Sequence, residues 1–362
     1  METQPFERPL RDSLPTASLT TLRLRAGLRA ALRRFFERHG YLEVETPILS
    51  HDVVVDAHLE PFVTRWDAAG GGLAAAGAVA GGRELFLQTS PEFGMKRLLA
   101  AGATAIYQVT RGFRNGERGR LHNPEFTLIE WYRTGDTHHD QMDFAEELVA
   151  SFFAEAERLT AYEHQPEAPT RDVDSLARPF SRITYDDAFA QFAGSRVLDP
   201  CASDLAALAA RHGIAAPPGL APDDRDGWLN LLLAELVEPR LGVERPTFLY
   251  DYPASQGALA RLRPDDPRVA ERFELYIQGV EICNGYHELL DADELRRRMG
   301  EQAELRRREG RRALPMENRL LEAMESGLPA CSGVALGFDR LLMAAVGAGS
   351  LDEVTAFPID RA

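Results

Sequence analysis

The 362-residue sequence has few cysteines and no long apolar run. Its three cysteines, Cys201, Cys283 and Cys331, are too widely spaced for the paired motifs that bind zinc or exchange disulfides, and they fit a reducing cytoplasm. No uninterrupted apolar stretch reaches the roughly 18 residues that a membrane-spanning helix needs, and the N-terminus has no signal-peptide pattern. We therefore expect a cytoplasmic protein that neither crosses a membrane nor is secreted.

Positive charge is also scarce. The sequence has 56 Asp and Glu residues against 41 Lys and Arg, and its net charge is −15. A protein that mainly binds RNA usually carries a basic surface, so this balance argues against tRNA as a partner. Eight arginines between Arg296 and Arg312 are interleaved with glutamates, which indicates a solvated helix rather than a nucleic-acid patch.

Side chains for nucleophilic or metal chemistry are missing as well. The sequence shows no Ser-His-Asp or Cys-His set. His138 and His139 lie in a polar segment without other metal ligands close by in the sequence, so we expect a loop there and no metal site. Any catalysis should therefore work by positioning and charge stabilisation rather than by a protein nucleophile.

Predicted helices and strands alternate irregularly along the chain. Apolar residues recur at helical spacing from Leu24 to Phe36, and Gly40 follows as a stop signal. Because strands are interrupted by helices without a regular βαβ repeat, the pattern predicts an α+β fold with an antiparallel sheet flanked by helices. We expect an N-terminal arm (1–20), a main domain (21–362), a glycine-rich surface loop (67–82) and a helical insertion at about 195–242.

The segment from Phe113 to Arg133, FRNGERGRLHNPEFTLIEWYR, is the most informative part of the sequence. Two strand-like runs, 105–111 and 125–132, flank a glycine-containing loop. Arg114, at the end of the first strand, can present its guanidinium fork to a phosphate. Alternation along the second strand places Phe126, Glu130 and Tyr132 on one face. This arrangement predicts a site that binds a nucleoside triphosphate and a second substrate.

Two glutamates further along the chain predict a magnesium site. If Gln278 and Gly279 form a two-residue turn, residue 276 pairs with 281 and residue 274 pairs with 283. Glu274 and Glu281 then share a face as diagonal neighbours, roughly 7–8 Å apart at Cα. Two carboxylates in this position could hold Mg²⁺ against a triphosphate.

The Phe113–Arg133 segment closely resembles motif 2 of class II aminoacyl-tRNA synthetases, in the form seen in lysyl-tRNA synthetases and their tRNA-independent relatives. Val44-Glu45-Thr46-Pro47 resembles motif 1, the dimer-forming element, and the segment Gly333–Arg340 resembles motif 3. With Thr89–Glu92 and Glu281–Glu288, the resemblance extends from about residue 22 to residue 362. It implies the class II catalytic fold, a homodimer, and ATP with Mg²⁺ as cofactors.

The same resemblance implies roles for individual residues in amino-acid adenylation. Arg114 would bind the α-phosphate and the substrate carboxylate, and His122 would bind the leaving phosphates. Phe126 would stack on one face of adenine, and Arg340 would lie on the other face, near the γ-phosphate. Glu117 is the candidate to replace an adenine-contacting glutamate that the family often has at position 116. The implied ATP-binding residues are Arg114, Asn115, Gly116, His122, Asn123, Phe126, Glu281, Ile282, Gly337 and Arg340.

The amino-acid pocket implied by the resemblance suits a diamine. Glu288 with Tyr132 would receive the distal ammonium, Glu92 the amino group near the carboxylate, and Asn284 the carboxylate itself. Acids at both ends of a pocket would leave a neutral amino acid facing an unpaired buried charge. The implied substrate-binding residues are Ser90, Pro91, Glu92, Tyr132, Asn284, Glu288 and Ala335.

Ala335 separates two versions of this activity. Lysyl-tRNA synthetases normally have glycine here, whereas alanine resembles the elongation factor P–(R)-β-lysine ligases, which lack an anticodon-binding barrel. With motif 1 at Val44, this sequence also leaves no room for that barrel. We therefore expect a ligase that adenylates (R)-β-lysine and transfers it to a lysine of elongation factor P. The alternatives are a lysine-activating, tRNA-charging enzyme and a catalytically silent regulatory paralogue.

Overall fold

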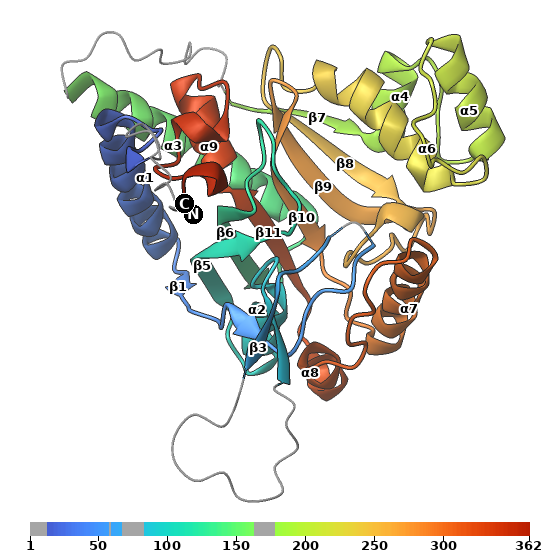
Figure 1. Cartoon of the computed structure of the whole chain (residues 1–362), viewed down its shortest axis with the longest axis horizontal. Helices are drawn as coiled ribbons and strands as arrows, with labels where there is room; N and C mark the ends of the chain where they lie inside the picture. Colours follow the sequence, from blue (N-terminus) through green and yellow to red (C-terminus); the bar gives the residue numbers. More distant parts are fainter. Residues whose placement is uncertain (1–12, 58, 67–82, 163–177) are drawn as a thin grey trace, which may run out of the picture.

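The computed structural model describes residues 13–57, 59–66, 83–162 and 178–362. An eight-stranded sheet runs through the centre of the molecule (Figure 1). In spatial order its strands are β1 (Leu42–Glu43), β5 (Ala105–Phe113), β6 (Glu125–Thr134), β11 (Cys331–Gly337), β10 (Val280–His287), β9 (Val269–Ile277), β8 (Thr247–Pro253) and β7 (Ser181–Thr184).

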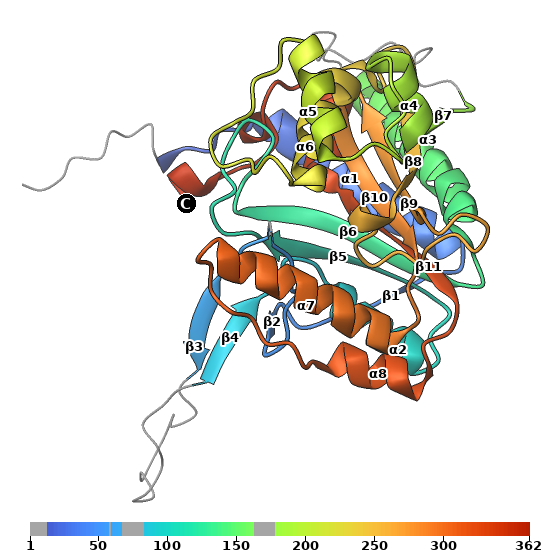
Figure 2. The same ribbon diagram turned by 90° about the vertical axis from the view of Figure 1, so that its right-hand side faces the viewer.

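Helices cover both faces of this sheet, as Figure 2 shows from the side. One face packs against α1 (Leu19–Arg38), α3 (His138–Tyr162) and α9 (Phe338–Val346), around a core that includes Phe36 and Trp131. On the other side lie α2 (Glu92–Ala100), α7 (Ala292–Arg308), α8 (Arg319–Gly327) and a small sheet of β2 (Leu49–Ser50), β4 (Arg83–Leu87) and β3 (Val63–Trp66). Among the described helices, none is both long and apolar enough to cross a membrane.

The predicted α+β class is confirmed. The inner strand pairs are antiparallel, but the pairs β1–β5 and β7–β8 at the two edges are parallel, which the sequence reading did not anticipate. A parallel pair needs a crossover connection. Between β7 and β8 that connection contains α4 (Tyr185–Phe192), α5 (Ala202–Arg211) and α6 (Arg225–Leu232). These helices have a core of their own, including Phe189 and Trp228. The helices predicted at about 195–242 are confirmed by α5 and α6, while the interpretation of this segment as an insertion stays a prediction.

The structure describes only part of the predicted N-terminal arm, and it changes the assignment of the histidine pair. Residues 1–12 of the predicted arm and the predicted loop 67–82 lie outside the described residues. In the described part of the arm, the Thr16 amide donates to the Ala356 carbonyl (2.9 Å) and Ser18 caps α1. The loop predicted at His138 and His139 is wrong, because both residues belong to the first turn of α3.

The β9–β10 hairpin carries two of the predicted site residues. Its two-residue turn at Gln278 (φ 50°) and Gly279 (φ 72°) is confirmed, and Glu281 pairs with residue 276 as expected. The expected pairing of Glu274 with residue 283 is wrong. A bulge between residues 281 and 283 inserts one residue, so Glu274 lies opposite Asn284 instead.

The hairpin turn is held by the segment before β8, and this contact requires glycine at position 242. The carbonyl of Gly242 (φ +69°) accepts a hydrogen bond from the Gln278 amide (2.7 Å), and a Cβ atom there would lie 2.3 Å from the Tyr276 carbonyl oxygen. Gly40 has a similar φ (+75°) but open space around it.

We therefore expect Gly242→Ala to lower the melting temperature much more than Gly40→Ala. Both variants carry the left-handed backbone penalty of roughly 1–2 kcal/mol, but only Gly242→Ala adds a backbone clash. Circular dichroism melting curves of the two variants measure the difference. Equal losses would contradict the role assigned to this contact.

Candidate active site

A cavity of about 960 Å³ lies between the main sheet and helix α7. This volume is within the usual range of small-molecule sites. Side chains from β6, β9, β10 and β11 line the cavity, together with residues from the N-terminus of α2 and from α6. The predicted site residues on its wall are Ser90, Glu92, Arg114, Tyr132, Glu274, Glu281, Asn284, Glu288 and Ala335.

A buried lysine that the sequence reading missed stands behind two of these carboxylates. Only 2% of the Lys96 side chain is exposed, and its Nζ lies 2.5 Å from Glu92 Oε1 and 2.5 Å from Glu288 Oε2. Burial opposes the charge, but Glu288 and Glu92 outweigh it and raise the pKa of Lys96 above its usual range, so Lys96 stays an ammonium. The sequence did hold a signal, because Glu92 and Lys96 are four residues apart on a predicted helix.

This ion triad corrects one expectation about the pocket. Because two carboxylate oxygens contact the same nitrogen atom, Glu92 and Glu288 lie side by side. The prediction that they stand at opposite ends of the pocket is therefore wrong.

A third carboxyl, Glu130, adjoins the triad. It accepts hydrogen bonds from the hydroxyls of Tyr132 (2.7 Å) and Ser90 (2.8 Å). Burial, and then the nearby Glu92, raise the pKa of Glu130 to about 7, and burial also raises the pKa of Glu288. Three carboxyls thus share one ammonium, so this end of the cavity favours a further cation.

Several buried polar atoms around the cavity have no hydrogen-bond partner within the described residues. Glu288 forms an ion pair with Lys96 through Oε2, and its Oε1 has no hydrogen-bond partner among the described residues. Asn284 donates to the Tyr286 hydroxyl (2.9 Å), which leaves its Oδ1 unpaired. Contact between Asn284 and a substrate carboxylate stays a prediction, since the free atom in this orientation is an acceptor.

Two donors that line the cavity also lack a partner within the described part of the chain. The Nε atoms of Arg114 and Arg272 are buried without a partner among the described residues. Buried polar groups in proteins are nearly always satisfied, by other protein groups or by ordered water, and a bound ligand can take the place of that water. The cavity therefore suits a ligand that carries both N–H groups and anionic oxygens.

Two side chains that were predicted to bind different parts of ATP lie together: Arg114, predicted at the α-phosphate, and Phe126, predicted at adenine. The Arg114 guanidinium lies over the Phe126 ring, 5.0 Å from its centroid, and Nη1 is 3.8 Å from Glu117 Oε1. A Cβ atom on Gly112 would lie 2.8 Å from the same ring, so glycine at this position makes room for it. The adenine contact predicted for Glu117 stays a prediction.

Arg340 connects two other predicted site residues. Its Nη1 lies 3.1 Å from Glu281 Oε2, and its Nη2 lies 2.8 Å from His122 Nε2. Arginine only donates, so this ring nitrogen of His122 accepts. Burial, and then the charge of Arg340, lower the pKa of His122, which keeps the ring neutral near pH 7. The structure thus brings His122, Arg340 and Glu281 together.

The two predicted magnesium ligands differ in how free their carboxylates are to bind an ion. Burial, and then Glu274, raise the pKa of Glu281, whose side chain remains 38% exposed inside the cavity. Glu274 already accepts hydrogen bonds from Tyr252 (2.6 Å) and Tyr276 (2.6 Å) at Oε2 and from Arg272 (2.5 Å) at Oε1. Glu281 is therefore the better Mg²⁺ ligand, and direct ligation by Glu274 stays a prediction.

The other predicted residues lie outside the cavity wall. Asn123 fixes its loop, donating to the Glu125 carbonyl (2.7 Å) and accepting from the Ile359 amide (3.0 Å). The side chain of Ile282 is buried in the main core, so only its backbone can face a nucleotide. Pro91 precedes α2, Asn115 and Gly116 lie in the loop after β5, and Gly337 precedes α9.

Comparison with known proteins places these features in one family. The family model "tRNA synthetases class II (D, K and N)" matches residues 4–361. The chain is 44% identical to the elongation factor P–(R)-β-lysine ligase of Vibrio vulnificus (strain YJ016), over 96% of this chain and 98% of that protein. It is 44% identical to the ligase of the same name from Vibrio cholerae serotype O1, over 97% and 99% of the two chains. The Yersinia enterocolitica protein of that name is 42% identical over 96% and 98%.

Gly333 offers a test of the pocket geometry. A Cβ atom at this position would lie 2.1 Å from the Tyr132 ring and 2.8 Å from Glu288 Oε1. We expect Gly333→Ala to displace both side chains and to lower kcat/KM for amino-acid activation roughly 100-fold, the scale of a 1 Å misplacement in a site. Amino-acid-dependent ATP–pyrophosphate exchange measures the effect. Gly300→Ala on α7, where a Cβ meets nothing within 4 Å, is the matched control. Parent-like exchange by Gly333→Ala would contradict the geometry.

Proposed function

The chain belongs to the family of class II tRNA synthetases (D, K and N), and on this basis we propose that it is an ATP-dependent ligase that adenylates (R)-β-lysine and transfers it to a lysine of elongation factor P. The names of relatives that match over nearly the full length of both chains support this substrate pair. One structural observation carries the proposal: the unpaired acceptors on Glu288 and Asn284 face the same cavity as the unpaired donors on Arg114 and Arg272.

A diamino acid bound together with the phosphates of ATP would supply donors for the carboxylate and acceptors for the guanidinium groups. Its ammonium group would donate to Glu288, next to the excess of carboxyls over ammonium groups. Its carboxylate and the phosphate of ATP would accept from Arg114. A monoamino acid would leave Glu288 Oε1 without a hydrogen-bond donor, and an unsatisfied buried group typically costs about 1–3 kcal/mol.

In the proposed first step, a carboxylate oxygen of the amino acid attacks the α-phosphorus of ATP. The bond to pyrophosphate breaks and an aminoacyl-adenylate remains. Arg114 would stabilise the charge at the α-phosphate, while Arg340 and His122 would hold the leaving phosphates. Mg²⁺, when bound, would neutralise phosphate charge, and Glu281 is the residue suited to hold it.

In the proposed second step, the ε-amine of the acceptor lysine attacks the adenylate carbonyl carbon. The bond to AMP breaks, the nitrogen loses a proton to solvent, and an amide forms.

We also propose that the enzyme is a cytoplasmic homodimer. Large apolar side chains are exposed on β1 and on the small sheet, with Leu42 63%, Leu49 42% and Val63 37% exposed. They flank the segment that resembles motif 1, and exposed apolar patches commonly mark protein interfaces. The three cysteines are unpaired, in keeping with a reducing compartment.

Acceptor transfer is the direct test of this function. Purified protein is incubated with ATP, Mg²⁺ and labelled (R)-β-lysine, and either elongation factor P or bulk tRNA is offered. We expect label on elongation factor P and stoichiometric AMP, and no activation of 3-aminohexanoic acid, which lacks the distal amine. Arg114→Ala should lose about 10²–10³-fold in rate, whereas Arg120→Ala in the same loop should not.

Two outcomes would overturn the proposal. Label appearing mainly on tRNA would make the protein a tRNA-charging enzyme. No AMP formation with any amino acid would make it a catalytically silent paralogue.

Ala335 tests the preference between β-lysine and lysine. It lies on β11 between Glu130 of β6 and Asn284 of β10, and it lines the cavity. We expect Ala335→Gly to make room for an α-amino group and to raise the lysine/β-lysine activity ratio by roughly 10–200-fold, the worth of one methyl group in a pocket. Pyrophosphate exchange with each amino acid gives the ratio. An unchanged ratio would mean that other residues set the specificity.

A further inference from the structure

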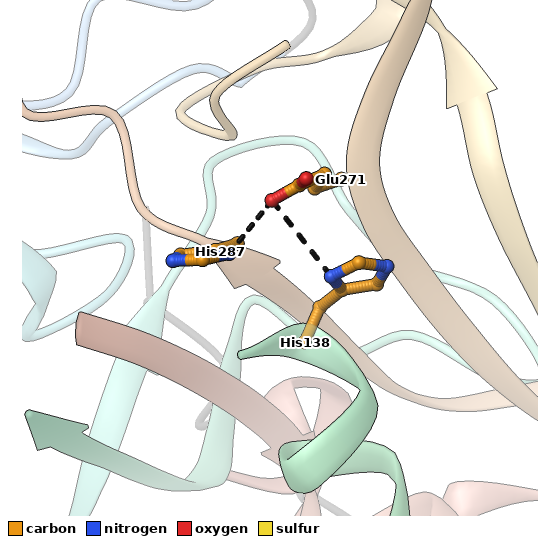
Figure 3. Close-up of side chains that lie close together, drawn as sticks. All are labelled: His138, Glu271 and His287. Atoms are coloured by element: carbon orange, nitrogen blue, oxygen red, sulfur yellow. Dashed lines mark ion pairs between the residues drawn. The ribbon is translucent and has the colours of Figure 1, made fainter. Parts of the chain in front are cut away.

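Two histidines and a glutamate meet outside the amino-acid cavity. His138 comes from the first turn of α3, Glu271 from β9 and His287 from the end of β10, and their side chains point toward one another (Figure 3). One ligand atom from each lies within 4.8 Å of the others. All three residues are more than nine-tenths buried. They border a separate cavity of about 380 Å³.

The polar atoms of this cluster lie close together without forming regular hydrogen bonds to one another. His287 Nδ1 is 2.7 Å from Glu271 Oε2, but it is not aligned for a hydrogen bond. His138 Nδ1 is 3.9 Å from the same oxygen, which is too far. Both ring nitrogens of His138 and Nδ1 of His287 lack a hydrogen-bond partner among the described residues. Buried unsatisfied groups of this kind call for an explanation.

We propose that His138, Glu271 and His287 form a binding site for a transition-metal ion, with Zn²⁺ as the best match. Two imidazoles and one carboxylate are ligands that zinc takes in proteins, whereas Mg²⁺ prefers oxygen ligands alone. Zinc–ligand bonds of about 2.0–2.1 Å in a tetrahedron separate neighbouring ligand atoms by about 3.3 Å. The observed separations of 2.7 and 3.9 Å lie on either side of this value.

The groups around the three ligands fit this assignment. Metal-bound histidines usually donate their other N–H to a carboxylate. Here the nearby carboxylate oxygen is Asp251 Oδ1, which is buried without a hydrogen-bond partner among the described residues and lies 3.8 Å from His138 Nε2, beyond hydrogen-bond distance. Ligating carboxylates are usually held by hydrogen bonds as well, and the Arg261 Nε donates to Glu271 Oε2 at 2.6 Å.

The charge of the cavity lining also suits a cation. The cavity is lined by the carboxylates of Asp251, Asp265 and Glu271 against the guanidinium groups of Arg261 and Arg263, so acids are in excess.

Bound metal would join α3 to the adjacent strands β9 and β10. His287 directly precedes Glu288, so the ion would fix the backbone beside the amino-acid pocket. We assign it a structural role, independent of the proposed ligase activity.

The test uses full-length protein that has been stripped of metal with a chelator. Zn²⁺ is titrated in competition with a chromophoric chelator, and Co²⁺ is added separately as a spectroscopic probe. We expect one Zn²⁺ per chain, visible absorption bands of tetrahedral Co²⁺, and a higher melting temperature with Zn²⁺. His138→Gln should weaken Zn²⁺ binding at least roughly 10–100-fold and abolish the gain in melting temperature, since even outer-shell changes have effects of this size.

His139→Gln is the matched control, because His139 is the next residue and lines the same cavity but is not in the cluster. It should bind Zn²⁺ like the parent. If His138→Gln does not fold, Glu271→Gln replaces it, with folding checked by near-ultraviolet circular dichroism. The proposal is overturned if the parent binds no stoichiometric Zn²⁺, or if the folded ligand variants bind it as tightly as the parent.

Discussion

The buried ammonium of Lys96 is the interaction on which the pocket depends. It contacts Glu92 at the start of α2 and Glu288 just after β10, two residues far apart in the chain. A buried charge without a partner is strongly unfavourable, and breaking a buried ion pair typically costs about 3–5 kcal/mol. Lys96 therefore determines where both carboxylates stand, and it leaves Glu288 Oε1 free to accept a hydrogen bond from a further donor.

Strand register then arranges the rest of the site around this triad. In neighbouring strands, Glu130, Ala335 and Asn284 lie opposite one another, so they form a row on one face of the sheet. The bulge in β10 places Glu274 opposite Asn284 while Glu281 remains near the turn, next to Arg340. Arg114 follows the far end of β5, six residues beyond the position opposite Glu130, so its guanidinium is separated along the sheet from the carboxyls around Lys96. A charged diamino acid and a phosphate bound together require such a separation.

The sequence predicted those features that depend only on neighbouring residues, such as tight turns and single strands. The turn at Gln278 and Gly279 follows from residues that tolerate positive φ, and the strands on either side of Arg114 follow from their alternation. The bulge in β10 could not be predicted, because hydrophobic alternation does not show where one extra residue is inserted. The partners of His138 were missed for a different reason: Glu271 and His287 are more than a hundred residues away in the sequence and meet it only through the sheet.

The end of β10 is where these features converge. The Glu288 amide donates to the Cys331 carbonyl (3.0 Å), and the His287 carbonyl accepts from the Arg261 amide (2.9 Å), so the backbone is fixed from both sides. Consecutive residues of an extended strand point to opposite faces. His287 accordingly lies in the histidine cluster beside α3, while Glu288 faces the amino-acid cavity. The two side chains share this fixed stretch of backbone, so holding His287 in place also restricts the positions open to the Glu288 carboxylate. A carboxylate that is held in place before binding loses less conformational entropy when it binds an ammonium group.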